Sequence, residues 1–365
     1  MPVNDISVGE AVKRALDEAM RERGHANILL AGRTGVGKST LINSVFQGQF
    51  ATTGQGRPVT EGTREITKEG IPLTLFDTRG LEMAEFATTL TQLRTFVAER
   101  RRDQDARKHV HVAWVCVSED LRRVEEAESK LVDMLSDFMP VVAVVTKARA
   151  DQGFRAEVQR LLPRTTNTLR VRAIDEVLDD GHTLPAMGLV ELIQATLELI
   201  PEGQRRAFVA AQKADLEMKR KRSHLVVGGA AAAAAGVAAI PIPFADAALL
   251  IPIQLGMLAG ISTTYGLDVS EAFLGTLIGT TVGSTAATVA GRAIVAGILK
   301  LIPGAGSVVG GAIAAATAVT MTTSLGEIYI AALAKLFAKN GGEQPTPEEV
   351  LVAVRSAMSK EGPSK

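Results

Sequence analysis

The sequence has little cysteine, few aromatic residues and no net charge, and these absences exclude several classes of protein. Cys116 is the single cysteine, which excludes an intramolecular disulfide and a metal site built from several cysteines. The 40 basic residues balance the 40 acidic ones, so the chain lacks the basic surplus with which nucleic-acid-binding proteins neutralise phosphates. No nucleic-acid partner is therefore expected. The first residues also lack a secretion signal, which favours a cytoplasmic protein.

Charge is also scarce in one long stretch of the chain. The 102 residues from Leu225 to Gly326 carry five charged side chains, whereas 22% of the whole sequence is charged. The same stretch holds 16 of the 34 glycines. Since one hydrophobic core rarely exceeds about 250–300 residues, a chain of 365 residues is expected to form several parts. The predicted parts are an N-terminal amphipathic helix (1–26), a charged globular domain (27–203), a basic helical linker (204–224), an apolar Gly/Ala-rich helical domain (225–340), and a C-terminal helix and tail (341–365).

The charged domain alternates short apolar runs with helical patterns. The apolar runs cover 27–31, 73–76, 110–117, 141–145 and 169–171. Near-continuous Val/Ile/Leu runs between helices indicate a mostly parallel sheet with helices on both faces, which is an α/β fold. The polar segment 50–65 predicts a mobile loop. Near the other end, Thr346, Pro347 and Glu349 predict a helix start with a capping box.

The strongest motif is a glycine-rich loop between a predicted strand and a predicted helix. Residues 32–39 read G-R-T-G-V-G-K-S, the pattern of a phosphate-binding loop in its usual context. The glycines let backbone N–H groups surround phosphate oxygens, while Lys38 reaches the β- and γ-phosphates and Ser39 ligates Mg²⁺. We therefore expect a nucleoside triphosphate site. The expected contacts are Thr34, Gly35, Val36, Gly37, Lys38, Ser39 and Thr40.

A second motif, D-T-R-G at 77–80, follows the apolar run 73–76. An aspartate at a strand end, here Asp77, can hold Mg²⁺ through water, and the Gly80 amide can contact the γ-phosphate. Between the two motifs, Thr60 or Thr63 could complete the Mg²⁺ shell.

The element that would read the base departs from the usual pattern. Thr146 and Lys147 follow the run 141–145, but the position three residues after Thr146, which normally carries a carboxylate for guanine, is Arg149. The nearest acid is Asp151, which a loop rearrangement could bring to the base. Otherwise guanine selectivity would be weaker than usual. Ala173, after the last apolar run, is expected to contact the base oxygen through its amide.

The order of these motifs resembles the Era-like branch of the translation-factor-related GTPases. More narrowly, the chain is similar to bacterial Era-like GTPases fused to a C-terminal Gly/Ala-rich helical domain of unknown function; 240–246 and 302–306 carry that likeness. A helix before and helices after the GTPase domain also resemble the layout of immunity-related GTPases. The resemblance implies GTP and GDP as ligands, with Mg²⁺. It favours Thr60 as the switch threonine, although Thr63 fits the Era pattern as well.

The same resemblance bears on hydrolysis. Many relatives place a glutamine directly after D-x-x-G to orient the attacking water, whereas this chain has Leu81. With leucine at this position, the resemblance implies a GTPase that hydrolyses GTP slowly alone and is activated by nucleotide-dependent homodimerisation or by a partner. Lys38, Thr60, Gly80 and Arg33 are the expected catalytic residues. Arg33 and Arg79 are candidates for stabilising charge, and each could instead pair with an acid such as Glu82 or Glu85.

The apolar domain leaves two interpretations open. In the first, its helices associate with a membrane surface, and the basic run Lys219–Arg222 binds anionic headgroups. Arg292 and Lys300 would then face a polar interface, and Pro241, Pro243, Pro252 and Pro303 would interrupt the helical segments. In the second, alanine and glycine build a soluble bundle that docks a protein partner, and the chain is a GTP-loaded switch with negligible turnover.

Overall fold

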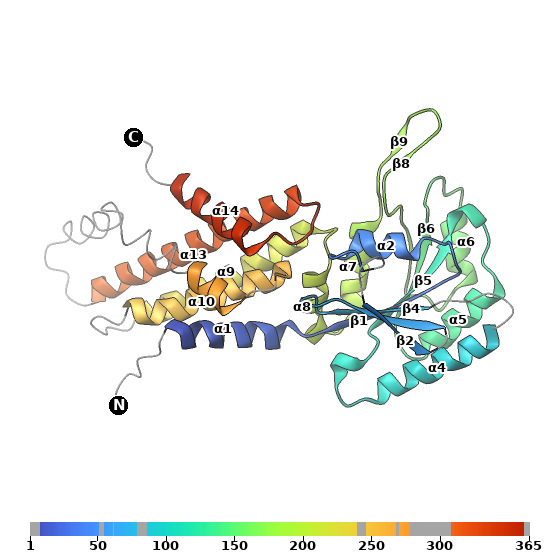
Figure 1. Ribbon diagram of the computed structural model, residues 1–365, viewed down its shortest axis with the longest axis horizontal. Coiled ribbons are helices and arrows are strands. Elements are labelled where there is room, and N and C mark those ends of the chain that lie inside the picture. Colours follow the sequence, from blue (N-terminus) through green and yellow to red (C-terminus); the bar gives the residue numbers. More distant parts are fainter. Residues whose placement is uncertain are drawn as a thin grey trace. The chain divides into compact units, whose positions relative to one another are not determined.

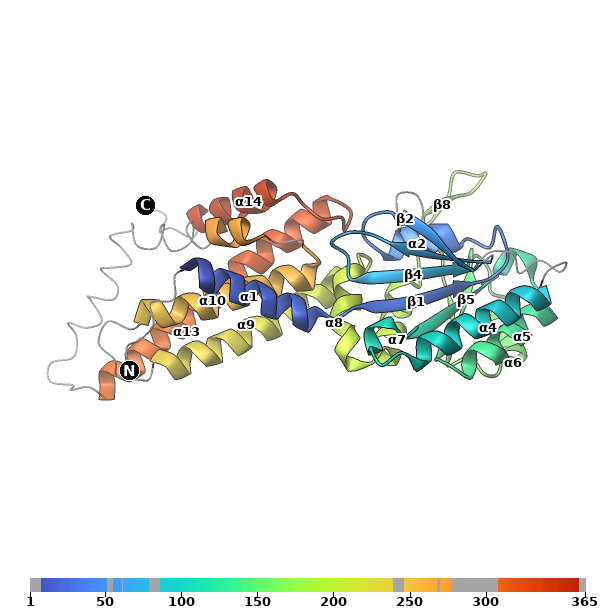
Figure 2. The same cartoon turned by 60° about the horizontal axis from the view of Figure 1, so that its bottom comes forward.

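The structure is a computed structural model, and it describes residues 8–50, 55–60, 62–78, 86–238, 246–267, 270–277 and 308–360. The chain forms two compact units, shown in Figures 1 and 2. One unit spans Arg23–Asp215. The other combines residues up to Glu22 with residues from Leu216 onward. The boundary therefore lies inside the predicted linker 204–224, and the N-terminal helix is grouped with the helical region.

The first unit is built on a seven-stranded sheet in the order β2-β3-β4-β1-β5-β6-β7. Strands β4, β1, β5, β6 and β7 are parallel, whereas β2 and β3 form an antiparallel extension beside β4. The strands are β1 (Ala26–Ala31), β2 (Gln55–Thr60), β3 (Thr63–Thr67), β4 (Leu73–Thr78), β5 (Val112–Ser118), β6 (Val141–Thr146) and β7 (Asn167–Arg170). The central strands β1, β5 and β6 are buried at every position, as their continuous apolar runs predict.

Helices cover both faces of this sheet. On one face, α4 (Phe86–Arg102), α5 (Glu126–Ser136) and α6 (Phe154–Leu161) share a core with strand residues such as Val115 and Ala143. On the other face lie α2 (Lys38–Val45), α7 (Leu189–Leu199) and α8 (Glu202–Ala211). There Trp114 of β5 stacks on Phe46 and donates a hydrogen bond to Thr196 of α7. The predicted α/β architecture is confirmed.

The segment 50–65 corrects one expectation. Instead of a mobile loop, residues 55–60 form β2, which pairs antiparallel with β3. Gly56 and Pro58 disfavour a strand, but β2 is the edge strand of the sheet, where proline is tolerated, and its backbone pairing with β3 overrides the composition on which the loop prediction depended. Residues 51–54 and 61 lie outside the described part of the chain.

The second unit is helical. Its long helices are α1 (Val8–Arg23), α9 (Leu216–Ala238), α10 (Asp246–Tyr265), α13 (Val308–Lys339) and α14 (Pro347–Lys360), and residues 271–277 are also helical. Its core joins residues of all five long helices, including Val12, Leu258, Tyr329 and Val350, and it includes Val227 of α9. The α14 capping box is confirmed, because Thr346 and Glu349 exchange hydrogen bonds between side chain and backbone.

Two expectations about this unit need correction. Pro252 lies inside α10 and does not end it. Because it is the seventh residue of the helix, the backbone donor that it lacks affects one hydrogen bond near the helix start. Lys219 is completely buried, so it cannot bind headgroups as part of a surface-exposed basic run.

In the described residues, no helix is both long and apolar enough to cross a membrane. Pro241, Pro243, Arg292, Lys300 and Pro303 lie outside the described residues.

Candidate nucleotide-binding site

The glycine-rich loop connects the carboxyl end of β1 to the start of α2. Gly32, Gly35 and Gly37 have φ angles of +141°, +78° and +96°, which side-chain-bearing residues rarely adopt. At Gly32 a Cβ atom would also lie 2.5 Å from the Cys116 carbonyl oxygen. The loop therefore needs glycine for both its backbone conformation and its close approach to β5. It ends at Gly37, and α2 begins with Lys38.

Lys38 folds back over this loop. Its Nζ donates hydrogen bonds to the carbonyl oxygens of Gly32, at 2.7 Å, and Arg33, at 3.0 Å. Thr34, Gly35, Ser39 and Thr40 are exposed along the same loop and the first turn of α2, whereas the Val36 side chain is buried. The ammonium group and the α2 N-terminus thus meet at an accessible surface with positive potential, the arrangement that binds phosphates.

Arg33 has a carboxylate partner that the sequence did not indicate. Its guanidinium pairs with Glu125, which also lies 3.0 Å from an Arg123 nitrogen. Glu125 is the N-cap residue of α5 and takes part in its capping box. The predicted alternative partners of the two arginines, Glu82 and Glu85, lie outside the described residues, as do Arg79, Gly80 and Leu81.

The residues expected to hold Mg²⁺ lie on β2, β3, β4 and α2. Asp77 is the penultimate residue of β4 and pairs in register with Leu30, two residues before the glycine-rich loop. Thr60 ends β2 half-buried, whereas Thr63 is 1% exposed and opposes Thr78 on β4. The structure therefore places Asp77 at the carboxyl end of β4, beside the end of β1 from which the loop begins. Of the two threonines, Thr60 is the more accessible.

Thr146 ties the base-reading element to the phosphate loop. Its hydroxyl lies 2.6 Å from the Val36 carbonyl oxygen and 3.2 Å from the Val117 carbonyl oxygen, both of which accept its hydrogen. The next residue, Lys147, has φ +53°, and its Nζ lies 3.6 Å from Asp120. The loop after β6 is therefore anchored to the phosphate loop through one side chain.

Comparison with known families agrees with this geometry. Residues 27–147 match the 50S ribosome-binding GTPase family, and residues 204–359 match a domain of unknown function, DUF697. The first unit has the P-loop GTPase fold. No relative was found among curated proteins. The Era-like branch and the immunity-related layout remain predictions.

Several solved structures are similar to the GTPase domain. The T. maritima FeoB cytosolic domain in its GMPPNP form is 18% identical, with a TM-score of 0.31, over 47% of this chain and 63% of that domain, less than two thirds of its length. Toc33 from Arabidopsis thaliana with Mg²⁺ and GMPPNP is 14% identical, with a TM-score of 0.33, over 56% of this chain and 94% of that one. The probable GTP-binding protein engB is 16% identical, with a TM-score of 0.32, over 49% of this chain and 99% of that one.

Glu119 is a residue of the GTPase domain that the sequence analysis missed. It follows β5 directly, is 4% exposed, and accepts a hydrogen bond from the Arg149 amide at 2.7 Å. It also accepts two hydrogen bonds from the Arg170 guanidinium, at 2.8 and 3.0 Å. Burial alone would raise the pKa of Glu119, but these hydrogen bonds outweigh it and lower the pKa. Its signal in the sequence is an acid placed directly after a buried strand.

The remaining base-loop residues contact neighbouring segments of the GTPase domain. Asp151 Oδ1 accepts the Arg155 amide at 2.8 Å, in the first turn of α6, and lies 3.6 Å from Arg170. Arg149 makes a bidentate pair with Glu176 of β8 (Glu176–Val177). This strand forms a hairpin with β9 (Thr183–Leu184), and Ala173 lies half-buried just before it.

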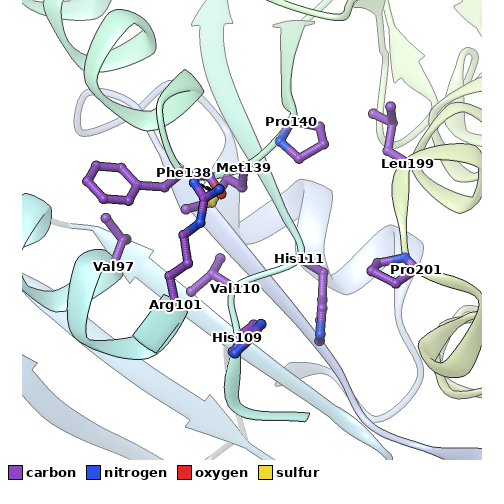
Figure 3. A pocket seen from close by; sticks show the side chains of 10 residues that line it. All are labelled: Val97, Arg101, His109, Val110, His111, Phe138, Met139, Pro140, Leu199 and Pro201. Atoms are coloured by element: carbon purple, nitrogen blue, oxygen red, sulfur yellow. Dashed lines mark hydrogen bonds between the residues drawn. The ribbon is translucent and has the colours of Figure 1, made fainter. Parts of the chain in front are cut away.

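A separate cavity of about 210 Å³ lies at the amino ends of β5 and β6 (Figure 3). Its lining includes His109 and His111, which precede β5, and Pro140, which precedes β6. Because the glycine-rich loop follows β1, this cavity and the loop occupy opposite ends of the parallel strands. His111 Nδ1 accepts the Asn27 amide at 2.9 Å, and its Nε2 lies 3.0 Å from the Ala106 carbonyl oxygen. These contacts assign His111 a packing role.

Proposed function

We propose that this chain binds GTP with Mg²⁺ and hydrolyses it to GDP and phosphate. The observation that carries the proposal is the loop from Gly32 to Ser39, whose left-handed glycines and Lys38 ammonium lie at the N-terminus of α2. The family match over residues 27–147 supports the same assignment.

The donor set fits a magnesium ion. The Ser39 hydroxyl and the Asp77 carboxylate are hard oxygen ligands, which Mg²⁺ prefers together with phosphate oxygens and water. Thr60 would complete the shell, with Thr63 as the alternative. When bound, the ion neutralises charge between the phosphates. The chain itself would contribute Lys38 at the β- and γ-phosphates and the Gly80 amide at the γ-phosphate.

Turnover by one chain alone should be slow. The Leu81 side chain has no polar atom with which to orient water, and the Arg33 guanidinium is paired with Glu125. A second copy or a protein partner would supply the missing positive charge or free Arg33. Nucleotide-dependent homodimerisation is the simplest such activation.

The helical unit would respond to the nucleotide state at a membrane surface. The scarcity of charge between Leu225 and Gly326 supports this reading. The second candidate is a GTP-loaded switch without turnover, whose helical bundle docks a protein partner. The absence of glutamine at Leu81 favours that candidate.

Calorimetry with GTP, followed by phosphate release over a series of protein concentrations, tests the proposal. Binding in the presence of Mg²⁺, with a specific activity that rises with concentration, would support a GTPase activated by self-association. Binding with no release at any concentration would support the switch. Absence of GTP binding would contradict both.

A further inference from the structure

Four carboxylates contact the loop after β6, where an arginine replaces the usual base-reading acid. Asp120, in the turn after β5, pairs with Lys147. The other three belong to Glu119, Asp151 and Glu176, and they differ in what already binds them. Ligands of open α/β sheets bind in the crevice beyond the carboxyl ends of the strands. Because β6 and β7 are parallel neighbours, the loops that follow them begin beside each other at the carboxyl end of the sheet. We treat these two loops as the two walls of the base site, so a base-reading carboxylate is expected to face the space between them.

Both oxygens of Glu119 are already bound by protein groups. It is almost fully buried, and its two oxygens receive the Arg149 amide and the Arg170 guanidinium. A carboxylate with this burial and these partners positions the loop backbone and has no open side for a ligand.

One oxygen of Asp151 is bound to the first turn of α6. Its Oδ1 accepts the Arg155 amide, which belongs to the orphan donors at the start of that helix, and the same oxygen lies 3.6 Å from Arg170. Both contacts involve the same oxygen, and the hydrogen bond satisfies a donor in the first turn of α6. The Asp151 side chain is 37% exposed, so its part in reading the base needs a direct test.

Glu176 is placed differently, because it lies on the opposite wall. It follows the loop after β7, three residues beyond Ala173, and opens the β8–β9 hairpin that projects from the sheet in Figure 1. Both of its oxygens are bound by the Arg149 guanidinium, so this pair spans the two walls. Its side chain is 28% exposed. Each carboxylate oxygen has two lone pairs, so the pair with Arg149 leaves acceptor positions for a ligand.

We propose that Glu176, held in place by Arg149, supplies the carboxylate that reads the guanine base. This assignment rests on the proposed function. The carboxylate accepts hydrogen bonds from the guanine ring N1–H and the exocyclic amine. Adenine presents an acceptor at N1, so it is disfavoured at the same position. The acid that reads the base thus comes from the hairpin, and the arginine on the base loop fixes its orientation.

The test compares the affinities of GTP, XTP and ATP in variants of the full chain. Xanthine carries an oxygen where guanine carries its amine, so an amide in place of the reading carboxylate accepts from N1–H and donates to that oxygen. Glu176→Gln should lower GTP affinity by about 10- to 100-fold, the loss of a hydrogen bond to a charged group, and raise XTP affinity relative to GTP. A merely structural role would not produce this gain.

Two variants serve as controls. Asp179→Asn removes the same charge from the same hairpin, and Asp151→Asn tests the acid nearest the base loop. Both should keep the wild-type ratio of GTP to XTP affinity. An unchanged ratio in Glu176→Gln, or an inverted ratio in Asp151→Asn, would overturn the assignment while leaving GTP binding intact. Wild-type protein that binds no GTP would overturn both this assignment and the proposed function.

Discussion

At the scale of single residues, burial separates two lysines that look equivalent in the sequence. Lys38 is half-buried and bonded to loop carbonyl oxygens that phosphate oxygens can replace as its partners. Lys219 is fully buried, donates to the Tyr265 carbonyl oxygen at 3.0 Å, and lies over the Phe337 ring. Burial lowers the pKa of Lys219 well below its ordinary value. The first lysine is therefore available to a ligand, whereas the second closes the C-terminal end of α10 inside its own unit.

Lys38→Ala should weaken GTP binding by at least about 100-fold, because it removes a charged donor to two phosphate groups. Calorimetry with GTP in the presence of Mg²⁺ measures this loss. Lys130→Ala is the matched control, since Lys130 makes only an exposed pair with Glu126 four residues earlier. Unchanged GTP affinity in the Lys38 variant would contradict the phosphate-loop assignment.

His25 should make the GTPase domain sensitive to acid. Burial, with a smaller contribution from neighbouring His111, lowers the pKa of His25 to about 4. An unfolded histidine titrates near 6.5, so between these values the unfolded chain binds a proton that the folded chain does not. The free energy of unfolding should therefore fall as the pH drops from about 6.5 towards 4, by about 2 kcal/mol at pH 5 for this residue.

Urea unfolding at pH 7.5 and pH 5 measures that dependence. The His25 Nε2 lies 2.8 Å from Thr74 Oγ1, and His25→Gln keeps a polar partner for that hydroxyl while removing the titration. The variant should lose less stability on acidification than the wild type. His182→Gln, in the exposed hairpin, should behave as the wild type does. Equal acid sensitivity in all three proteins would show that His25 is not responsible.

At the scale of elements, the sequence predicts well what short patterns encode. The glycine-rich loop, the buried central strands and the α14 capping box depend on neighbouring residues, and each is found where its motif lies. β2 was missed because it forms through backbone pairing with β3 at the edge of the sheet, which its own composition does not indicate. Glu119 and Glu176 were missed because their partners, Arg170 and Arg149, are 51 and 27 residues away.

The packing of α9 against α13 depends on one glycine. A Cβ atom at Gly326 would lie 2.5 Å from Val227 Cγ2 and 3.0 Å from Met257 Sδ. Branched Val227 cannot move away easily, so Gly326→Ala should destabilise the helical unit by about 1–3 kcal/mol. Gly228 is the matched control, because a Cβ there meets nothing within 4 Å. Gly228→Ala should stabilise α9 by up to about 1 kcal/mol through helix propensity.

Thermal unfolding followed by circular dichroism compares the two alanine variants. Opposite shifts of the midpoint are expected, downward for Gly326→Ala and upward for Gly228→Ala. An upward shift in both would mean that α9 and α13 are not in close contact at Gly326.

At the scale of the whole molecule, composition predicts two kinds of unit, but not which helices join them. Helix α1 is amphipathic, and its sequence does not say what its apolar stripe contacts. In the structure Ala11, Val12 and Ala15 enter the core of the helical unit, more than 200 residues along the chain. The contact between α1 and helices so distant in the sequence is visible only in the folded core. It also changes which charges remain at the surface of the unit, since Lys219 is interior while Arg220 and Lys221 are exposed.

This distribution sharpens the test of membrane association. The full chain should float with anionic liposomes at low salt, and replacing the exposed Arg220 and Lys221 with glutamine should weaken flotation by about 1 kcal/mol per residue. The difference should vanish at high salt, because counterions screen exposed charges. Replacing Lys130 and Arg160, which are exposed on the GTPase domain, removes the same charge and should leave flotation unchanged. If the full chain ignores liposomes at low salt with either GDP or a GTP analogue, the membrane proposal is wrong. The helical unit would then be a soluble bundle, and its partner a protein.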